Sequence, residues 1–287
     1  MLNNWFYSHQ TWEVALAICS VMVIVTLIGL YFFHRMVDWH SREKDTKLVG
    51  LSYALCGSVY TVLLAFVAVG AYETMDKTES ITAGEADALG ALAFDSAGLP
   101  ADLALHVRAD IDDYISVVTK KEWPSQRAYR MDLRYYDEGW DETRHLNRDL
   151  ADFEPSTPGQ ATVKTEMERV SNELYAARRT RLLAASAHIP NAIWEMLIFG
   201  LLLIAVYVYL FGPHSFGIHM AVTALTMVTL GLVISLIIAL DYPFRGDLSV
   251  DSEAYVAVQE VTNHIFEHAA TAPSGAIRQS ADYAKAK

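Results

Sequence analysis

The sequence predicts an all-α membrane protein with four spanning helices and a helical extramembrane insert between the second and third spans. Three observations lead to this fold class. Hydrophobic residues make up 53% of the 287 positions, they gather in four long runs, and apolar residues in the polar segment between the second and third runs recur at helical spacing. Such clustering separates a membrane protein from a soluble protein with a large core.

Each hydrophobic run is long enough to cross a hydrocarbon layer, which takes about 20 residues of helix. The runs cover residues 14–33, 48–72, 192–211 and 216–240 and carry almost no charge. Only "GPHS" separates the last two runs, which predicts a tight antiparallel hairpin. We expect that the first run is not a cleavable signal peptide, because it is too long, no basic region precedes it, and "YFFHRMVDW" lacks a small-residue cleavage site.

The polar insert covers residues 73–188 and holds most of the charge excess of the chain. It contains 22 acidic and 14 basic residues, a net charge of about −8, in a chain whose formal net charge is −12. We therefore divide the chain into a first helix pair (1–72), the helical insert (73–188), a helix hairpin (189–240) and an extramembrane tail (241–287).

One helix of the insert is expected to begin near Pro100, a residue that suits a first helical turn. Trp123 and Pro124 are expected to close it, because the residue before a proline avoids the helical conformation. The buried face of this helix consists of Val107, Ile111, Tyr114 and Val118.

A long helix of the insert is expected from Thr157, its N-cap, towards Pro190, where the third span starts. Its apolar stripe consists of Val163, Met167, Val170, Leu174 and Ala177. Residues 129–158 have weaker periodicity and are expected to be rich in loops. In this interpretation the first and last helices of the insert continue directly from the second and into the third span.

The second span carries a stripe of mostly small residues, which fits two interpretations. The stripe consists of Gly57, Thr61, Ala65, Ala68 and Tyr72. Small residues let helices approach closely in lipid, so the simpler interpretation is helix packing. The other interpretation makes this stripe a pore wall, with Leu64 or Phe66 as a constriction that gates by dewetting.

Glu73 and Asp76 follow directly after the second span, with no proline to end the helix. Symmetric copies of these carboxylates around an axis would form an acidic pore mouth that attracts cations and repels anions. Alternatively, they mark only the point at which the helix leaves the membrane.

Glu195 lies about one helical turn inside the third span, with Asn191 one turn earlier on the same face. Carboxylates inside spans are costly, about 2.5–3.5 kcal/mol at the membrane centre, and usually face protein or water. Glu195 is thus either an interfacial carboxylate or the buried partner of a cation from another helix or subunit.

The tail begins with "DYPFRGDLSVD", which is too polar for lipid. We interpret its residues Asp241, Pro243, Phe244, Arg245 and Gly246 as a structural motif: the proline ends the fourth span, the glycine supplies a turn, and the arginine pairs with a nearby carboxylate. A short extended piece, "DLSV", is then expected to lead to an amphipathic helix that Asp251 or Ser252 caps and that docks on the insert. Residues from Thr271 onward are expected to be frayed.

No sequence feature indicates catalysis, a metal or a cofactor. P-loop, dinucleotide, CxxC and HExxH motifs are absent, and no serine or cysteine has an identifiable base beside it. Cys19 and Cys56 lie inside spans, which argues against a disulfide framework. The acidic balance argues against nucleic acid as a partner.

Two groups of acidic residues in the insert are interpreted as solvated helix faces, since residues one or two apart on a helix point in different directions. The groups are Glu85 with Asp87, and Asp110 with Asp112 and Asp113. The histidines His106, His145, His188, His214 and His219 show no metal-ligand spacing.

The charge distribution favours an extracytoplasmic insert. The loop after the first span contains Arg35, Arg42, Lys44 and Lys47, whereas the N-terminal tail contains no Lys or Arg, so the positive-inside rule places that loop in the cytoplasm. Basic residues also flank the spans on the other side, namely Lys77, Arg178, Arg179 and Arg181.

Five segments resemble, in content and order, the bestrophin-like family of uncharacterised membrane proteins, a domain of unknown function. They are "GSVYTVLLAFVAVGAYE", "EADALGAL", "EWP", "RRTRL…IPNAIWEML" and "LDYPFRGDLSV". The resemblance covers nearly the whole chain and implies four spans. Through a distant similarity to bestrophin channels, it also implies an oligomeric channel with the second span at the axis. Bestrophins conduct anions, which disagrees with the cation preference expected of an acidic mouth. Their helical region is cytoplasmic, which disagrees with the orientation that the charge distribution favours.

Two functions remain open on these grounds. One is a homo-oligomeric channel in the cell (inner) membrane, through which small inorganic ions pass. The other is a non-conducting scaffold or sensor that binds a partner through its extramembrane helices. In both cases we expect no enzymatic activity, with the lipid bilayer and further copies of the chain as partners.

Overall fold

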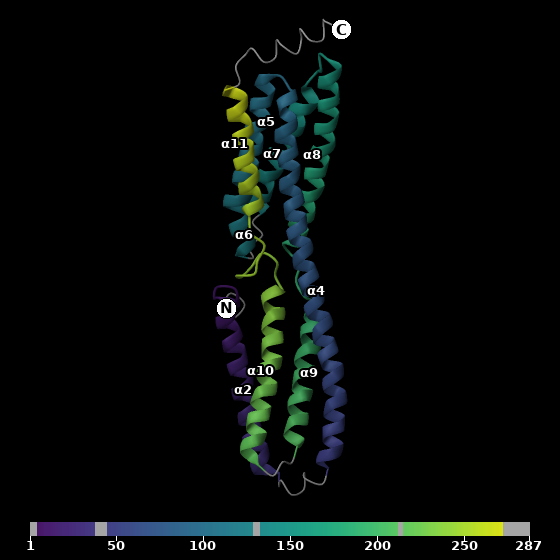
Figure 1. The fold of residues 1–287 in the computed structure, drawn as a ribbon, viewed down its shortest axis with the longest axis vertical. Helices are drawn as coiled ribbons and strands as arrows, with labels where there is room; N and C mark the ends of the chain where they lie inside the picture. Colours follow the sequence, from purple (N-terminus) through teal and green to yellow (C-terminus); the bar gives the residue numbers. More distant parts are fainter. Residues whose placement is uncertain (1–4, 38–44, 129–132, 212–214, 272–287) are drawn as a thin grey trace. The chain divides into compact units, whose positions relative to one another are not determined.

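The computed structural model describes residues 5–37, 45–128, 133–211 and 215–271, without the side chains of 133–135 and 264–271 (Figure 1). Helices joined by short turns make up these ranges, in which no strand occurs. The helices are α2 (Thr11–Met36), α4 (Thr46–Asp95), α5 (Ala101–Val117), α6 (Trp123–Arg127), α7 (Leu133–Asp152), α8 (Pro158–Ala184), α9 (Asn191–Leu210), α10 (Phe216–Leu240) and α11 (Glu253–Thr271). Some residues named in the sequence analysis lie outside the described ranges, namely Arg42, Lys44, His214 and the residues after Thr271.

Four of these helices, α2, α4, α9 and α10, are long and apolar enough to cross a membrane, which confirms the expected spans. By contacts, the chain divides into two compact units. The four-span unit consists of Met1–Thr78 and Ala184–Val250, and the helical unit consists of Glu79–Leu183 and Asp251–Lys287.

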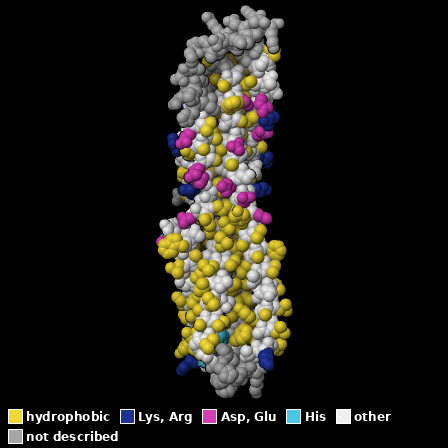
Figure 2. Space-filling view, viewed as in Figure 1, with side chains coloured by type: hydrophobic (Ala, Val, Ile, Leu, Met, Phe, Trp, Pro, Cys, Tyr) yellow, Lys and Arg dark blue, Asp and Glu magenta, His cyan; other side chains and the backbone are white. Residues whose placement is uncertain are grey.

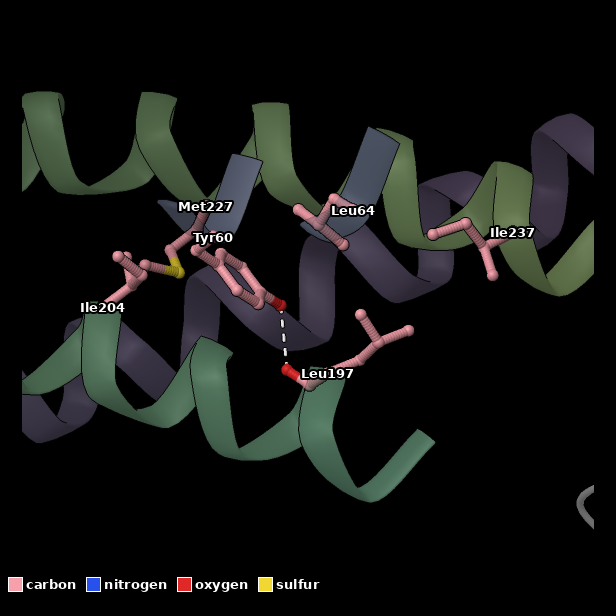
Figure 3. Packing of buried hydrophobic residues seen from close by; sticks show 6 residues of the cluster. All are labelled: Tyr60, Leu64, Leu197, Ile204, Met227 and Ile237. Atoms are coloured by element: carbon pink, nitrogen blue, oxygen red, sulfur yellow. Dashed lines mark hydrogen bonds between the residues drawn. The ribbon is translucent and has the colours of Figure 1, made fainter. Parts of the chain in front are cut away.

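The four-span unit is held together by close helix packing. Helix α2 packs along α10, and α4 packs against α9 and α10 through a hydrophobic cluster that includes Tyr60 and Leu64 (Figure 3). The Tyr60 hydroxyl donates a hydrogen bond of 2.8 Å to the Leu197 carbonyl oxygen. Its ring lies where a Cβ atom on Gly200 would have to be, so the small residue at this position permits the approach of α4 to α9.

The core of the helical unit confirms the expected buried faces of α5 and α8. On α5, Val107, Ile111 and Tyr114 are buried, and so is the following Val118. On α8, the buried residues include Met167, Val170 and Leu174. These residues recur every three or four positions, the spacing that brings one face of a helix to the core.

The tail helix α11 packs on α5, as expected. Arg108 on α5 donates a hydrogen bond of 2.8 Å to Asn263 on α11, and Tyr255 of α11 is fully buried. The backbone N–H of Glu253 donates to the Asp251 carboxylate at 2.9 Å, so one of the two expected caps is present. The tail therefore belongs to the helical unit from Asp251 onward.

Two expectations for the insert are wrong. Residues 129–158 are not mainly loop, because the 20-residue helix α7 occupies most of them. The expectation that Trp123 and Pro124 end the helical structure is also wrong. A π-helical stretch, Val118–Glu122, follows α5 and leads into α6, where the proline lies at the N-terminal end and needs no N–H partner.

Two connections also differ from expectation. Helix α8 begins with the expected cap, since the N–H of Gln160 donates to the Thr157 hydroxyl at 3.2 Å, but it ends at Ala184. Helix α9 begins only at Asn191, so the last insert helix does not run directly into the third span. The piece "DLSV" forms turns rather than an extended segment.

Candidate functional site

The stripe on α4 lies partly on the surface of the four-span unit. Thr61, Ala65 and Tyr72 are exposed, whereas Gly57 and Ala68 are half-buried. The stripe thus lies at the edge of the packed face of α4. Its exposed part makes few contacts within the chain and is free to face lipid, water or another subunit.

Leu64 and Phe66, the two residues considered for a constriction, lie in different environments. Leu64 is 2% exposed and packs inside the chain, in the cluster with Tyr60 and Leu197 (Figure 3). Phe66 is 74% exposed. Of these two residues, Phe66 is the one that a surface between subunits could contain.

Gly57 and Thr61 also line a groove on the four-span unit, with a volume of about 360 Å³. Thr226 and Thr229 of α10 line the same groove. Their hydroxyls donate to backbone carbonyls one turn earlier on their own helix, each at 3.0 Å, so they need no outside partner. The groove has the small side chains that favour close packing of a further helix.

Glu73 and Asp76 are both exposed on α4, as expected of residues at a mouth or at a membrane edge. Neither forms an ion pair with another residue in the described part of the chain. Within the described residues, their charges are therefore not neutralised by an ion pair.

Glu195 and Asn191 are exposed at the start of α9. Among the described residues, none forms an ion pair with Glu195, and its neighbours Met196, Ile198 and Phe199 are exposed apolar residues. Glu195 does not face the interior of its own subunit. Its two sequence interpretations, an interfacial carboxylate or a partner of another subunit, both fit this position.

Asp241 connects the end of α10 to the start of α9. Its carboxylate accepts a hydrogen bond of 2.6 Å from the backbone N–H of Ile189, just before α9 begins. Asp247 acts similarly on α2, because its carboxylate accepts a bond of 2.9 Å from the N–H of Thr11. These bonds satisfy donors at helix starts, where N–H groups lack helical partners.

The other motif residues pack this turn against the N-terminal segment. Phe244 is buried, and the backbone folds back so that the N–H of Val250 donates to the Pro243 carbonyl at 2.8 Å. Gly246 has φ +87°, a conformation that favours glycine. The guanidinium of Arg245 lies 4.3 Å from the centre of the Tyr7 ring. Arg245 thus has an aromatic contact, where the sequence predicts a carboxylate partner.

The helical unit contains a buried charge network that the sequence interpretation missed. Arg181 of α8 donates to Glu85 at 2.7 Å and to Glu122 at 2.8 Å, and Arg178 donates to Glu122 at 2.5 Å. All four side chains are fully buried. The expectation that Glu85 lies on a solvated face is therefore wrong, while Asp87 is exposed as expected.

Neighbouring groups complete this network. The Tyr114 hydroxyl donates to Glu85 at 2.5 Å, and burial together with the Glu85 charge raises the pKa of Tyr114. Burial by itself lowers the pKa of Arg181, but Glu85, Glu122 and two nearby tyrosines together raise it well above its usual value. Gly139 of α7 makes room for Arg178, whose guanidinium occupies the place of a Cβ atom there. The sequence did contain a signal for this burial. Arg178 and Arg181 follow Leu174 by four and seven positions, so they lie on the same face of α8 as its apolar residues.

The surfaces of the two units differ in kind. Hydrophobic side chains cover the visible face of the four-span unit, whereas acidic and basic side chains occur on that of the helical unit (Figure 2). Large apolar residues such as Phe66, Phe199 and Leu225 are more than 60% exposed. Exposed apolar surface of this extent suits a lipid environment.

Comparison with solved structures identifies the same fold in bacterial bestrophin homologues. A single-substitution variant of the homologue from Klebsiella pneumoniae matches with a TM-score of 0.61 and 13% identity over 87% of this chain and 99% of that chain. A second structure of the K. pneumoniae homologue matches with a TM-score of 0.57 and 13% identity, over 90% and 99% respectively. Among curated proteins, none matches the chain.

The family comparison agrees with the fold. The family model of the bestrophin-like domain matches residues 20–255, which is more than half of the chain and includes the helical unit up to the start of α11. It confirms the resemblance found in the five sequence segments. The chain is a multi-pass membrane protein that belongs to the bestrophin-like domain family.

Proposed function

We propose that the chain is the subunit of a homo-oligomeric ion channel in the cell membrane, with α4 lining the axis. One observation carries this proposal: an exposed face of α4 with small and polar residues leads directly to two carboxylates that have no ion-pair partner among the described residues. That face includes Thr61, Ala65 and Tyr72, followed by Glu73 and Asp76. Channel activity of the bestrophin family supports the proposal at the level of the family.

In this arrangement, symmetric copies of α4 place Thr61 and Ala65 around a water-filled path. Phe66 is the residue suited to a hydrophobic constriction, since it is exposed, whereas Leu64 is left out of the wall because it packs within its subunit. Glu73 and Asp76 form an acidic ring that raises the local concentration of cations. We therefore propose cation selectivity, in contrast to the anion conduction that the bestrophin resemblance implies.

Reconstitution tests the channel. Purified full-length protein in liposomes is expected to conduct K⁺ or Na⁺ along a gradient, with a reversal potential closer to that of the cation than of Cl⁻. The measurement covers a range of voltage, pH and divalent cation concentration, so that a closed gate does not hide conduction. Flux no higher than that of empty liposomes under all these conditions would contradict the proposal.

A non-conducting scaffold or sensor is the second function that we keep. It is favoured by the groove at Gly57 and Thr61, which fits a packed helix, and by exposed apolar residues of the helical unit. Phe94 is 69% exposed, Leu105 59% and Tyr175 51%, and these suit a protein partner. This function predicts that an axis between the subunits is plugged by lipid or side chains, or that no symmetric axis exists, so that no ions are conducted.

For orientation, we propose that the helical unit lies on the extracytoplasmic side. Four basic residues next to the spans on this side, Arg178 and Arg181 among them, argued for a cytoplasmic helical unit by the positive-inside rule. Arg178 and Arg181 are buried in ion pairs within the unit, so their charges do not lie at the membrane surface and only two of the four still count against our orientation. An alkaline phosphatase fused after Lys287 is expected to be active. An inactive phosphatase, with an active cytoplasmic reporter at the same position, would reverse the orientation.

A further inference from the structure

Three potential metal ligands meet between α5 and α7 in the helical unit. They are Asp110 on α5 and Glu142 and His145 on α7, and one ligand atom of each lies within 4.8 Å of the other two. Glu142 and His145 are three positions apart, so they share one face of α7. Their neighbours Ile111 and Leu146 are buried, which places the three side chains at the rim of the interface where α5 packs on α7.

The charges around Asp110 are not balanced. Its Oδ2 atom is buried and has no hydrogen-bond partner among the described residues. Asp110 and Glu142 bring two carboxylates within 4.8 Å of each other, and a bound cation would stabilise this arrangement.

Nearby basic residues already have carboxylate partners of their own. Arg144 pairs with Asp141 on α7, and Arg108 pairs with Asp112 at 3.7 Å and also donates to Asn263. His145 lies beside both carboxylates, with its Nδ1 atom 3.9 Å from a Glu142 oxygen.

The donor set indicates which cation fits. One imidazole nitrogen with two carboxylate oxygens suits zinc and related first-row transition metals, whereas calcium needs six to eight oxygens. In a tetrahedral set with bonds of about 2.0–2.2 Å, the ligand atoms of one zinc ion lie about 3.3–3.6 Å apart. The three ligand atoms lie within 4.8 Å of one another, so rotation of the exposed His145 side chain would have to bring them closer by at most about 1.5 Å.

We propose that Asp110, Glu142 and His145 form a binding site for a divalent transition-metal cation, with zinc as the probe. Bound metal joins α5 to α7, and a water molecule would complete a tetrahedral ligand set. The proposal concerns only the helical unit and does not depend on whether the chain conducts ions.

Metal binding is tested on the full chain in detergent, stripped with EDTA, by competition of Zn²⁺ with a chromophoric chelator and by thermal unfolding. Wild-type protein is expected to bind one Zn²⁺ per chain and to unfold at a higher temperature with metal, because a ligand that binds only the folded state stabilises it. His145→Gln is expected to weaken binding at least about tenfold. His106→Gln, an exposed histidine on α5 outside the cluster, is the matched control and keeps wild-type affinity.

Asp110→Asn provides a second readout, independent of possible misfolding of the histidine variant. It is expected to lose the Zn²⁺ site while its metal-free form is at least as stable as metal-free wild type, because a repelled carboxylate has been neutralised. The proposal is overturned if wild type and His145→Gln bind Zn²⁺ with equal affinity and stoichiometry. Equal thermal shifts with Zn²⁺ in wild type and a folded Asp110→Asn would overturn it as well.

Discussion

Arg181 and Glu85, which are 96 positions apart in the chain, form a fully buried ion pair in which the Arg181 Nε atom lies 2.7 Å from the Glu85 carboxylate. Glu122 accepts a second bond from the same guanidinium, so two arginines and two glutamates balance each other. The Nη1 atom of Arg181 has no hydrogen-bond partner among the described residues, although the guanidinium lies 5.7 Å from the centre of the Trp123 ring. Such a network ties α4, α5 and α8 to one arrangement, since any partner left alone in the core is costly.

Removing one charge of this network is expected to destabilise the helical unit. Arg181→Met leaves the Glu85 carboxylate buried without its main partner and should lower the free energy of unfolding by about 3–5 kcal/mol. Arg179→Met, at an exposed position two residues earlier, is the control and should change it by less than about 0.5 kcal/mol. Denaturant unfolding of the full chain in detergent, followed by tryptophan fluorescence, measures both.

The double variant Arg181→Met with Glu85→Met sharpens this prediction. It keeps the network neutral, because Arg178 and Glu122 remain paired at 2.5 Å. The double variant should be more stable than Arg181→Met alone. If it is the less stable of the two, the unpaired charge is not the source of the loss.

Gly200 should not tolerate a side chain. A Cβ atom there would collide with the Tyr60 ring, which is held in place by its hydrogen bond to the Leu197 carbonyl. Gly200→Ala is expected to separate α4 from α9 and to cost about 1–3 kcal/mol, as measured by thermal unfolding in detergent. Gly217→Ala on α10 is the control, because the added Cβ meets no atom of the other packed residues within 4 Å in the described part of the chain. Similar melting temperatures for both variants would argue against this packing.

Asp241 should be needed for its acceptor oxygen rather than for its charge. Asp241→Ala leaves the half-buried Ile189 N–H without the acceptor that now lies at 2.6 Å, and the lost hydrogen bond should cost about 1 kcal/mol. Asp241→Asn keeps a carbonyl oxygen at the same place and should retain most of the stability. Thermal unfolding of the two variants compares them; equal losses would mean that the negative charge matters more than the hydrogen bond.

Acidification should stabilise the metal-free helical unit through Asp110. Its folded-state pKa of about 6 lies above the usual value, so the folded state binds this proton more tightly than the unfolded state does. The contribution of Asp110 to stability is therefore fully present below its usual pKa and is lost as the pH rises through about 6. In EDTA, the melting temperature of wild type minus that of Asp110→Asn should fall between about pH 4.5 and pH 7. A difference that does not vary with pH would contradict this.

Neutral residues at the proposed mouth should weaken cation selectivity. Glu73→Gln combined with Asp76→Asn removes the acidic ring, so the ratio of cation to anion permeability should fall by at least about twofold at low ionic strength. Reversal potentials under a salt gradient measure this ratio. Glu154→Gln, an exposed residue between α7 and α8, is the control and leaves selectivity unchanged. The same selectivity in all three proteins would remove Glu73 and Asp76 from the conduction path.

The sequence predicted the spans and the main buried faces well, because both depend on local patterns. A run of about 20 apolar residues is enough to identify a span, whatever it packs against. In the helical unit, the spacing of Val107, Ile111 and Tyr114 likewise identifies a buried face. The prediction failed for α7, since most of its 20 residues are polar. Among its described side chains, the buried ones are Tyr136, Thr143, Leu146 and Leu150.

Charged residues show most clearly what local patterns leave out. Glu85 and Asp87 look alike in the sequence, yet Glu85 is buried against Arg181 and Asp87 is exposed, because only Glu85 lies on the face of α4 that meets α8. His145 had no metal-ligand spacing to Asp110, although the i, i+3 pair of Glu142 and His145 was a usable signal.

The sequence by itself determined that this is a four-span, all-helical membrane protein of the bestrophin-like family, since hydrophobic length and ordered motifs are properties of contiguous segments. The tertiary structure alone decided which carboxylates are buried, which side of α4 is exposed, and that Asp110 meets His145. These features depend on which faces of distant helices pack together. That choice is made by the sum of many long-range contacts, and no single segment contains it.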